Sequence, residues 1–392
     1  MSVTATPTTL SADERDAILQ AVREFAATRL APNALDWDRR KHFPRDVLAE
    51  AGELGVGGIY IREDVGGIGL QREDAAAIFE ALAAGDPTIA AYISIHNMVA
   101  WMIDTNGTDE QRRAWLPRLV TMQDLGAYCL TEPGAGSDAA AITTSAIADG
   151  DEYVLTGVKQ FISGAGAASV YVVMARTGAL RQAQEPRKSD GITAFLVPAD
   201  AAGLSFGPNE QKMGWNAQPT RQVILDEVRV PASAVLGELG GGFRIAMKGL
   251  DGGRVNIAAC SLGGAQWALD RAVRYVHERF TFGEALAERQ SVVFTLADMA
   301  TQLQAARALV RDAARAIDEG ASDAAVQCAM AKRFATDAGF EVANQALQLH
   351  GGYGYLQEYG IEKVVRDLRV HQILEGTNEI MRVIIGREVI GG

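Results

Sequence analysis

The spacing of apolar residues changes twice along this chain, and this change limits the folds that it can adopt. From residue 11 to about residue 125 the apolar residues recur at helical intervals, after the cap-like run Ser11-Ala12-Asp13-Glu14. Between about 126 and 237 the period shortens toward two, in short runs of β-branched and aromatic residues broken by Gly, Pro and Asp. After the glycine cluster at 240–242 the helical period returns. The pattern predicts an α+β protein in which a β domain separates two helical ones.

We expect three domains from this order. A chain of 392 residues exceeds the size at which a single hydrophobic core stops growing. The predicted domains are an N-terminal α-helical domain at 1–125, a middle antiparallel β domain at 126–237 and a C-terminal helical bundle domain at 238–392.

Two segments allow finer predictions. The spacing of Val293, Leu296, Ala300 and Leu303 predicts one face of an amphipathic helix in the C-terminal domain. The polar segment 178–191 is typical of a solvated loop between two strands of the β domain.

Composition and charge argue against several classes of partner. The net charge is −12, with no basic tail or patch to offset it, which disfavours nucleic acid and anionic membranes as partners. No apolar stretch approaches the ~20 residues of a membrane span, and the N-terminus lacks a basic start followed by an apolar run. We therefore expect no membrane insertion and a cytoplasmic protein. Three scattered cysteines and five histidines without paired spacing predict no disulfide framework and no metal site.

Several short motifs could bind a ligand, although each also has an ordinary structural explanation. The turn TEPGAGSD at 131–138 places short polar groups beside exposed backbone N–H donors, and a plain surface turn explains it about as well. Phe161, in KQFIS, is more typical of a strand core than of a ligand contact. Arg279, in ERFTFG, could hold a phosphate through its planar guanidinium, but a surface salt bridge is the usual role of an arginine. The glycine run QLHGGYGY, at 348–355, could admit a phosphate to bare backbone.

The order and combination of these motifs are specific. TEPGAGSD, KQFIS, ERFTFG, QLHGGYGY and LEGTNEI together resemble the acyl-CoA dehydrogenase family of flavoproteins, and the resemblance covers essentially the whole chain. It implies a middle antiparallel β-barrel domain and a C-terminal four-helix bundle, assembled as a homotetramer that is a dimer of dimers. It also implies FAD as the cofactor, an acyl-CoA as the substrate and electron-transferring flavoprotein as the electron acceptor.

The resemblance further implies roles for individual residues. The FAD contacts that it implies are Tyr128, Leu130, Thr131, Gly136, Ser137, Phe161, Ile162, Ser163, Arg279, Thr281, Phe282, Gln290, Gln348, Gly351, Gly352, Thr377 and Glu379. Among them, the segments around Arg279 and Gln348 match those that hold the FAD pyrophosphate and adenine across a subunit interface, so a dimer would be the smallest competent unit. The substrate contacts that it implies are Ser137, Asp251, Arg254 and Gly376.

Glu375 follows the apolar pair Ile373-Leu374, where a carboxylate must either point outward to water or be kept inside for a reason. The resemblance implies such a reason: Glu375 removes the proton next to the thioester carbonyl, while a hydride from the next carbon passes to flavin N5. It also implies an oxyanion hole made by the Glu375 backbone N–H and a ribityl hydroxyl of FAD. The apolar pair would dry the site and raise the pKa of the base. Some family members carry their base just before the arginine of the LDGGRVN motif, but that residue here is Gly253, which has no side chain.

The choice of acyl group depends on one or two carbons in an apolar pocket, worth roughly 1–3 kcal/mol. Local similarity in segments such as MGWNAQPTR and NIAACSLG favours isobutyryl-CoA, oxidised to methacrylyl-CoA in valine catabolism. 2-Methylbutyryl-CoA and straight short-chain acyl-CoAs are the rival substrates. A flavin oxidase or monooxygenase on the same fold and a catalytically silent acyl-CoA binder are the alternatives from other classes.

Overall fold

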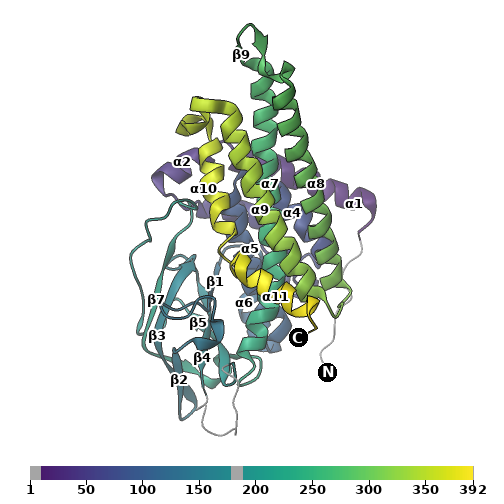
Figure 1. The fold of residues 1–392 in the computed structure, drawn as a ribbon. Coiled ribbons are helices and arrows are strands. Elements are labelled where there is room, and N and C mark those ends of the chain that lie inside the picture. The colour runs from purple at the N-terminus through teal and green to yellow at the C-terminus, as the bar shows by residue number, and fades with distance from the viewer. Residues whose placement is uncertain (1–9, 178–188, 392) are drawn as a thin grey trace.

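The computed structural model describes residues 10–177 and 189–391, in which a β domain lies beside a stack of long helices (Figure 1). Most of the predicted loop at 178–191 lies outside the described residues, and residues 189–191 form a turn that leads into the next strand. Within the described part of the chain, no helix is long and apolar enough to cross a membrane, and no cluster of three His, Cys, Asp or Glu side chains could hold a metal ion.

The N-terminal part is helical. Its helices are α1 (Ala12–Phe25), α2 (Ala34–Arg40), α3 (Arg45–Glu53), α4 (Arg72–Gly85), α5 (Pro87–Asn106) and α6 (Asp109–Val120). The predicted cap of α1 is confirmed, because the Ser11 hydroxyl accepts from the backbone N–H of Glu14 while the Glu14 carboxylate accepts from that of Ser11. Helix α5 is buried around most of its circumference, in keeping with its mostly apolar residues, and it contacts α4, α6, α7 and the first strand.

The middle part is one eight-stranded sheet. Its strands are β1 (Gly126–Cys129), β2 (Ser145–Asp149), β3 (Glu152–Ser163), β4 (Val170–Arg176), β5 (Ile192–Pro198), β6 (Leu204–Phe206), β7 (Thr220–Pro231) and β8 (Val235–Leu236). They follow the order β6-β7-β3-β2-β4-β5-β8, with β1 added on β4. Most pairings are antiparallel, as predicted, but β1 and β2 run parallel to β4, and among the described residues β6 and β8 are not paired to each other. The α+β class is confirmed, while the sheet is neither wholly antiparallel nor closed by pairing of its two end strands.

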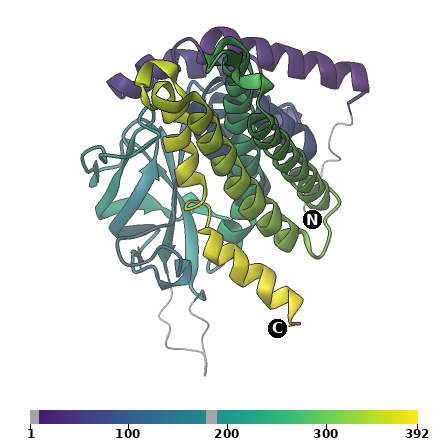
Figure 2. The ribbon, with the colours of Figure 1, turned by 45° about the horizontal axis from the view of Figure 1, so that its top comes forward.

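The C-terminal part returns to helices. Its elements are α7 (Gly242–Glu278), β9 (Phe280–Thr281), β10 (Glu284–Ala285), α8 (Gln290–Asp318), α9 (Ala324–His350), α10 (Ile361–His371) and α11 (Asn378–Val389). Helices α7, α8 and α9 pack side by side, with the β9–β10 hairpin at one tip (Figure 1). Figure 2 shows from a second direction that α10 lies between the β domain and these long helices.

The buried face of α8 differs from the predicted one. Leu303 is buried and Leu296 is partly buried, as expected, but Val293 and Ala300 are exposed. The buried stripe follows Met299, Leu303, Ala306 and Val310, and the first turns of α8, near the hairpin, contain no fully buried residue. The spacing of apolar residues could not distinguish the buried stripe from the predicted face beside it, because both sets of residues are apolar.

Candidate active site

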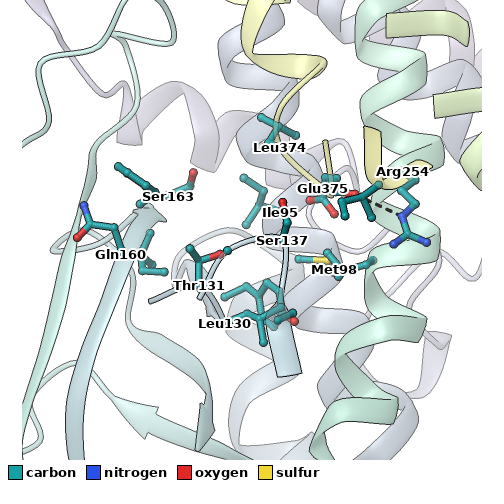
Figure 3. Close-up of a pocket in the computed structure, with 18 of the residues that line it drawn as sticks. Ile95, Met98, Leu130, Thr131, Ser137, Gln160, Ser163, Arg254, Leu374 and Glu375 are labelled. Atoms are coloured by element: carbon teal, nitrogen blue, oxygen red, sulfur yellow. Dashed lines mark hydrogen bonds between the residues drawn. The ribbon is translucent and has the colours of Figure 1, made fainter. Parts of the chain in front are cut away.

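A cavity of about 220 Å³ lies where the three parts of the chain meet. Helix α5 supplies one wall, the β domain a second, and α7 with the loop between α10 and α11 a third. In Figure 3 Thr131, Gln160 and Ser163 of the β domain lie across the pocket from Arg254 and Glu375. The lining residues are Ile95, Met98, Tyr128, Leu130, Thr131, Gly136, Ser137, Ala139, Gln160, Phe161, Ile162, Ser163, Trp215, Met247, Leu250, Arg254, Leu374, Glu375, Gly376 and Ile380.

Glu375 projects from a tight loop that its own backbone conformation creates. Its φ is +56° and that of Gly376 is +86°, so two successive residues are left-handed, which is unusual for a residue that bears a side chain. The Asn378 N–H donates to the Gln372 carbonyl at 3.0 Å and closes the loop. Arg254 Nε donates to the Glu375 carbonyl at 3.3 Å (Figure 3). The backbone around Glu375 is therefore held from both sides while its side chain faces the cavity.

Burial controls the ionisation of Glu375. Its Oε2 is buried and makes no hydrogen bond with any described residue. Burial raises the pKa of the Glu375 carboxyl to about 7, against the opposing pull of Arg254 and Lys332. Arg254 stabilises the carboxylate only in part, because its Nη1 forms an ion pair with Asp251 at 2.6 Å. A carboxyl group with a pKa near neutrality is suited to exchange protons at physiological pH.

Of the two apolar residues predicted to exclude water from the base, Ile373 and Leu374, only one lines the cavity. Leu374 lines the cavity, as expected, whereas Ile373 is half-exposed on the other side of the loop. The prediction that the pair Ile373-Leu374 shields the base is therefore wrong for Ile373. The left-handed residues of the loop, Glu375 and Gly376, come after this pair and so do not account for the difference.

A backbone donor lies at the same place as the base. The N–H of Glu375 finds no hydrogen-bond acceptor among the described residues. A free N–H beside a carboxylate can bind the oxygen of a carbonyl whose neighbouring carbon loses a proton, which is how an oxyanion hole stabilises developing charge.

The β-domain wall has the features of a surface that receives a flat polar group. Strand β3 has a bulge between Lys159 and Ile162, and Phe161 within it has a φ of +59° and a side chain that is 64% exposed. Added β-carbons at Gly134 and Gly136 would meet open space. The buried hydroxyl of Tyr128 and the indole N–H of Trp215 lack partners among the described residues, so each is available to a bound molecule.

Sequence reasoning did not find Trp215, which a buried ionic cluster holds in place. Its backbone N–H donates to Asp367 Oδ1 at 2.7 Å, and the other oxygen of Asp367 pairs with Lys363 at 2.7 Å. Lys363 also pairs with Asp86 at 2.9 Å, so the cluster joins the N-terminal part, α10 and the β-domain loop. The only signal in the sequence is a lysine four residues before an aspartate on one helix face, which is far more often a surface pair.

A second cavity, of about 400 Å³, lies near the tip of α7. It collects Arg279, Thr281, Gln348, Gly351 and Gly352, all of which were predicted for the pyrophosphate and adenine end of FAD. Added β-carbons at the two glycines would meet open space, and the buried Thr281 hydroxyl has no partner among the described residues. The two cavities share no lining residue. Residues predicted for one cofactor therefore fall into two separate sites of one chain.

Five predicted residues line neither cavity. Asp251 forms an ion pair with Arg254. Phe282 is 97% exposed in the hairpin, and Gln290 is exposed at the start of α8. Thr377 caps α11 by accepting from the Ile380 N–H, and Glu379 is exposed and pairs with Arg382. Their contacts with a ligand stay predictions.

Sequence reasoning also missed the apolar wall of the first cavity and the cation behind its loop. Ile95, Met98, Met247 and Leu250 line the cavity from α5 and α7, and no motif distinguishes them from ordinary core residues. Lys332 could have been noticed, because it stands among alanines on a helix whose neighbouring residues are buried.

Comparison with known proteins gives consistent matches over the whole chain. Residues 12–123 match the family model for the acyl-CoA dehydrogenase N-terminal domain, residues 127–228 that for the middle domain and residues 240–390 that for the C-terminal domain.

Individual relatives and structures agree. The chain is 53% identical to a mitochondrial isobutyryl-CoA dehydrogenase of Dictyostelium discoideum, covering 93% of this chain and 86% of the relative, and 50% identical to that of Bos taurus, covering 96% and 89%. Its fold matches butyryl-CoA dehydrogenase from Megasphaera elsdenii with a TM-score of 0.92, 37% identity and coverage of 98% and 99%. It also matches a glutaryl-CoA dehydrogenase from Mycobacterium smegmatis in complex with FADH2, with a TM-score of 0.90, 31% identity and coverage of 98% and 96%.

Proposed function

This chain belongs to the acyl-CoA dehydrogenase family, and we propose that it performs the FAD-dependent α,β-dehydrogenation of isobutyryl-CoA to methacrylyl-CoA, with Glu375 as the base. The observation that carries the proposal is the Glu375 carboxyl group, which has no partner at Oε2, lines the first cavity and has a pKa near 7. The family itself makes the chain an oxidoreductase that acts on CH–CH groups.

The protein's own groups account for the proton transfer. The α-carbon of a thioester gives up its proton to the Glu375 carboxylate, and the charge that develops on the thioester oxygen is bound by the Glu375 backbone N–H. Because base and donor belong to one residue, the left-handed turn fixes both relative to the substrate. Arg254, with Asp251, steadies the loop through the Glu375 carbonyl.

The residues of both cavities fit FAD. Family members bind FAD, as the FADH2 complex of the mycobacterial relative indicates. The open glycine turn, the unpaired Tyr128 hydroxyl and the outward Phe161 suit the flavin ring, and Arg279 with the bare glycines of the second cavity suits the phosphates and adenine. Bound FAD would supply the acceptor for the hydride that leaves the β-carbon.

The apolar lining supports a small acyl group. Ile95, Met98, Met247 and Leu250 surround a cavity of about 220 Å³, in which one or two extra carbons change the fit. The names of the two relatives at 53% and 50% identity favour isobutyryl-CoA over 2-methylbutyryl-CoA and straight short chains.

The partners follow from the separation of the cavities. Because the residues predicted for one FAD lie in two cavities that share no lining residue, we propose that two chains build each FAD site and that the assembly is a tetramer, a dimer of dimers. Electron-transferring flavoprotein would reoxidise the flavin. The two isobutyryl-CoA relatives are named as mitochondrial, and the cytoplasmic location expected from the sequence stays a prediction.

An anaerobic titration tests the proposal. FAD-loaded protein is mixed with isobutyryl-, butyryl-, 2-methylbutyryl- or isovaleryl-CoA while the flavin absorbance is followed. Rapid bleaching with isobutyryl-CoA in preference to the others is expected. If flavin is retained but another acyl-CoA bleaches it faster, the substrate is wrong and the reaction right; if none bleaches it, the proposed reaction is wrong.

Three further tests separate the alternatives. Glu375→Gln should keep the flavin and bind the acyl-CoA, yet reduce the bleaching rate about 10²–10⁴-fold or more, because a positioned base contributes at least that range. Admitting oxygen after bleaching tests the oxidase alternative, since stoichiometric peroxide formation at catalytic rates would favour it. Protein that stays colourless after incubation with FAD would favour a silent binder.

A further inference from the structure

Lys332, on α9, is buried directly behind the loop that carries Glu375. It is 0% exposed, and its Nζ donates to the Gly376 carbonyl at 2.8 Å and to Asn378 Oδ1 at 2.8 Å. It forms no ion pair with any described carboxylate. A fully buried ammonium without a direct counter-ion is costly, so its presence here needs a reason.

The two hydrogen bonds fall on the part of the loop that is conformationally unusual. Glu375 and Gly376 are both left-handed, and each of their carbonyl groups is bound by a cation: Glu375 by Arg254 and Gly376 by Lys332. Asn378, the second acceptor of Lys332, starts α11 and also donates to Asp337 at 2.7 Å. Lys332 therefore links α9 to Gly376 within the turn and to Asn378 at the end where α11 begins.

The other charged groups around the loop are compensated. Those that face it from neighbouring elements are Asp251 and Arg254 on α7, Arg333 and Asp337 on α9, and Glu379 and Arg382 on α11. These form ion pairs with one another, at distances from 2.6 to 3.7 Å.

The nearby titratable rings do not replace the charge of Lys332. Burial lowers the pKa of His371 to about 3, so it is neutral at physiological pH. Burial raises the pKa of Tyr60 and of Tyr128, so both phenols keep their protons. Lys332 itself has a pKa lowered by burial to about 8 and is mostly charged at neutral pH, with Glu375 acting against the decrease.

We propose that Lys332 is a positioning residue for proton abstraction by Glu375: its ammonium holds the left-handed turn and supplies the uncompensated positive charge that allows the buried base to ionise. The inference rests on the proposed function. It makes Lys332, a side chain that lines neither cavity, act beside Arg254 on the loop conformation and on the ionisation of the base.

Three substitutions separate charge from structure. Lys332→Met removes the charge and both hydrogen bonds, Lys332→Gln keeps a donor without charge, and Asn378→Ala keeps the charge but removes one acceptor. Lys212→Met is the matched control, because Lys212 also donates to one carbonyl and one side-chain oxygen and has a pKa lowered by burial to about 8, but it lies in another loop.

The first measurement is the anaerobic flavin-bleaching rate as a function of pH. The bleaching rate of the wild-type protein should rise with pH through a midpoint near 7, and the midpoint of both Lys332 variants should lie about one pH unit higher. The loss of rate relative to wild type should therefore be about 10-fold greater at pH 6 than at pH 9. Asn378→Ala and Lys212→Met should keep the wild-type midpoint. Equal losses at all pH values in Lys332→Gln, with an unmoved midpoint, would overturn the proposal and leave Lys332 as a structural residue; if Lys332→Met fails to fold, Lys332→Gln carries the test alone.

A second measurement does not require activity. The free energy of unfolding of the flavin-free protein is measured against pH for wild type, Glu375→Gln and Lys332→Gln. The part of the pH dependence of the unfolding free energy that is lost in Glu375→Gln reports the titration of Glu375. The midpoint of this titration should move to higher pH in Lys332→Gln. If none of the acyl-CoAs bleaches the flavin of the wild-type protein but this midpoint moves, the proposed function fails while the link between Lys332 and Glu375 stands. An unmoved midpoint overturns the link whatever the activity.

Discussion

The carboxylate of Glu375 fills the space that a β-carbon at position 253 would need. An added β-carbon on Gly253 would lie 2.5 Å from Glu375 Oε2 and 2.9 Å from its Cδ, closer than real contacts allow. The sequence excluded Gly253 as the base because glycine has no side chain. The structure adds a second reason for the glycine: α7 must be bare at this position for the carboxylate to stand where it does.

Gly253→Ala should therefore impair catalysis more than folding. The new methyl group displaces the Glu375 carboxyl by about 1 Å, and a misplacement of that size can reduce the rate of chemistry about 10²-fold. Bleaching of the flavin by acyl-CoA measures the rate, and thermal unfolding measures stability. Gly386→Ala is the control, because Gly386 is also helical but an added β-carbon there meets open space. A normal rate in Gly253→Ala would mean that the carboxyl group can move away without loss.

Exchanging the two residues should move the base rather than abolish it. The close approach of position 253 to the Glu375 carboxyl means that a glutamate at 253 can reach the same cavity once Glu375 is removed. Glu375→Gly should lose about 10²–10⁴-fold in rate, and adding Gly253→Glu should recover at least 10-fold of it. No recovery in a folded, flavin-binding double variant would show that the backbone of Glu375, and not only its carboxylate, must keep its native form.

The sequence predicted the fold class well, because class depends on local periodicity. The helix–strand–helix order and the cap at Ser11 follow from residues close together in the chain. Strand direction does not: β1 reaches β4 across intervening strands, and nothing in GAYCL distinguishes a parallel partner from an antiparallel one. The prediction of the buried face of α8 was wrong for the same reason, since that face depends on which neighbouring element packs on the helix.

The sequence predicted those residues of the candidate site that belong to short motifs, and it missed those whose partners are far away along the chain. The segments around Thr131, Phe161 and Glu375 converge on one cavity. Phe161 was expected to be more typical of a core residue, but a bulge in β3 turns it outward. Trp215 and Lys332 were missed because their roles arise from hydrogen bonds to residues 152 and 44 positions away.

The ionisation of Glu375 should make the flavin-free protein less stable as pH rises. Its folded pKa is raised from 4.5 to about 7, so the folded state holds the proton more tightly than the unfolded chain, and stability falls as pH increases from about 4.5 to about 7. Glu375→Gln lacks this decrease. Between pH 5 and pH 8 its advantage over wild type should grow by roughly 2–3 kcal/mol, measured by urea unfolding. Parallel pH profiles for the two proteins would contradict the raised pKa.

Arg279→Ala should weaken FAD retention more than acyl-CoA binding. Arg279 lies in the second cavity, away from Glu375, and its guanidinium sits 5.6 Å from the Tyr353 ring centre, with no carboxylate partner among the described residues. Losing a charge-assisted hydrogen bond to a phosphate costs roughly 1.5–3 kcal/mol, or about 10- to 150-fold in FAD affinity. Flavin released on gel filtration and acyl-CoA binding by equilibrium dialysis give the two affinities. Arg311→Ala, an exposed arginine on α8, is the control and should leave both unchanged. If Arg279→Ala loses both ligands equally, the second cavity is a structural element of the fold rather than part of the FAD site.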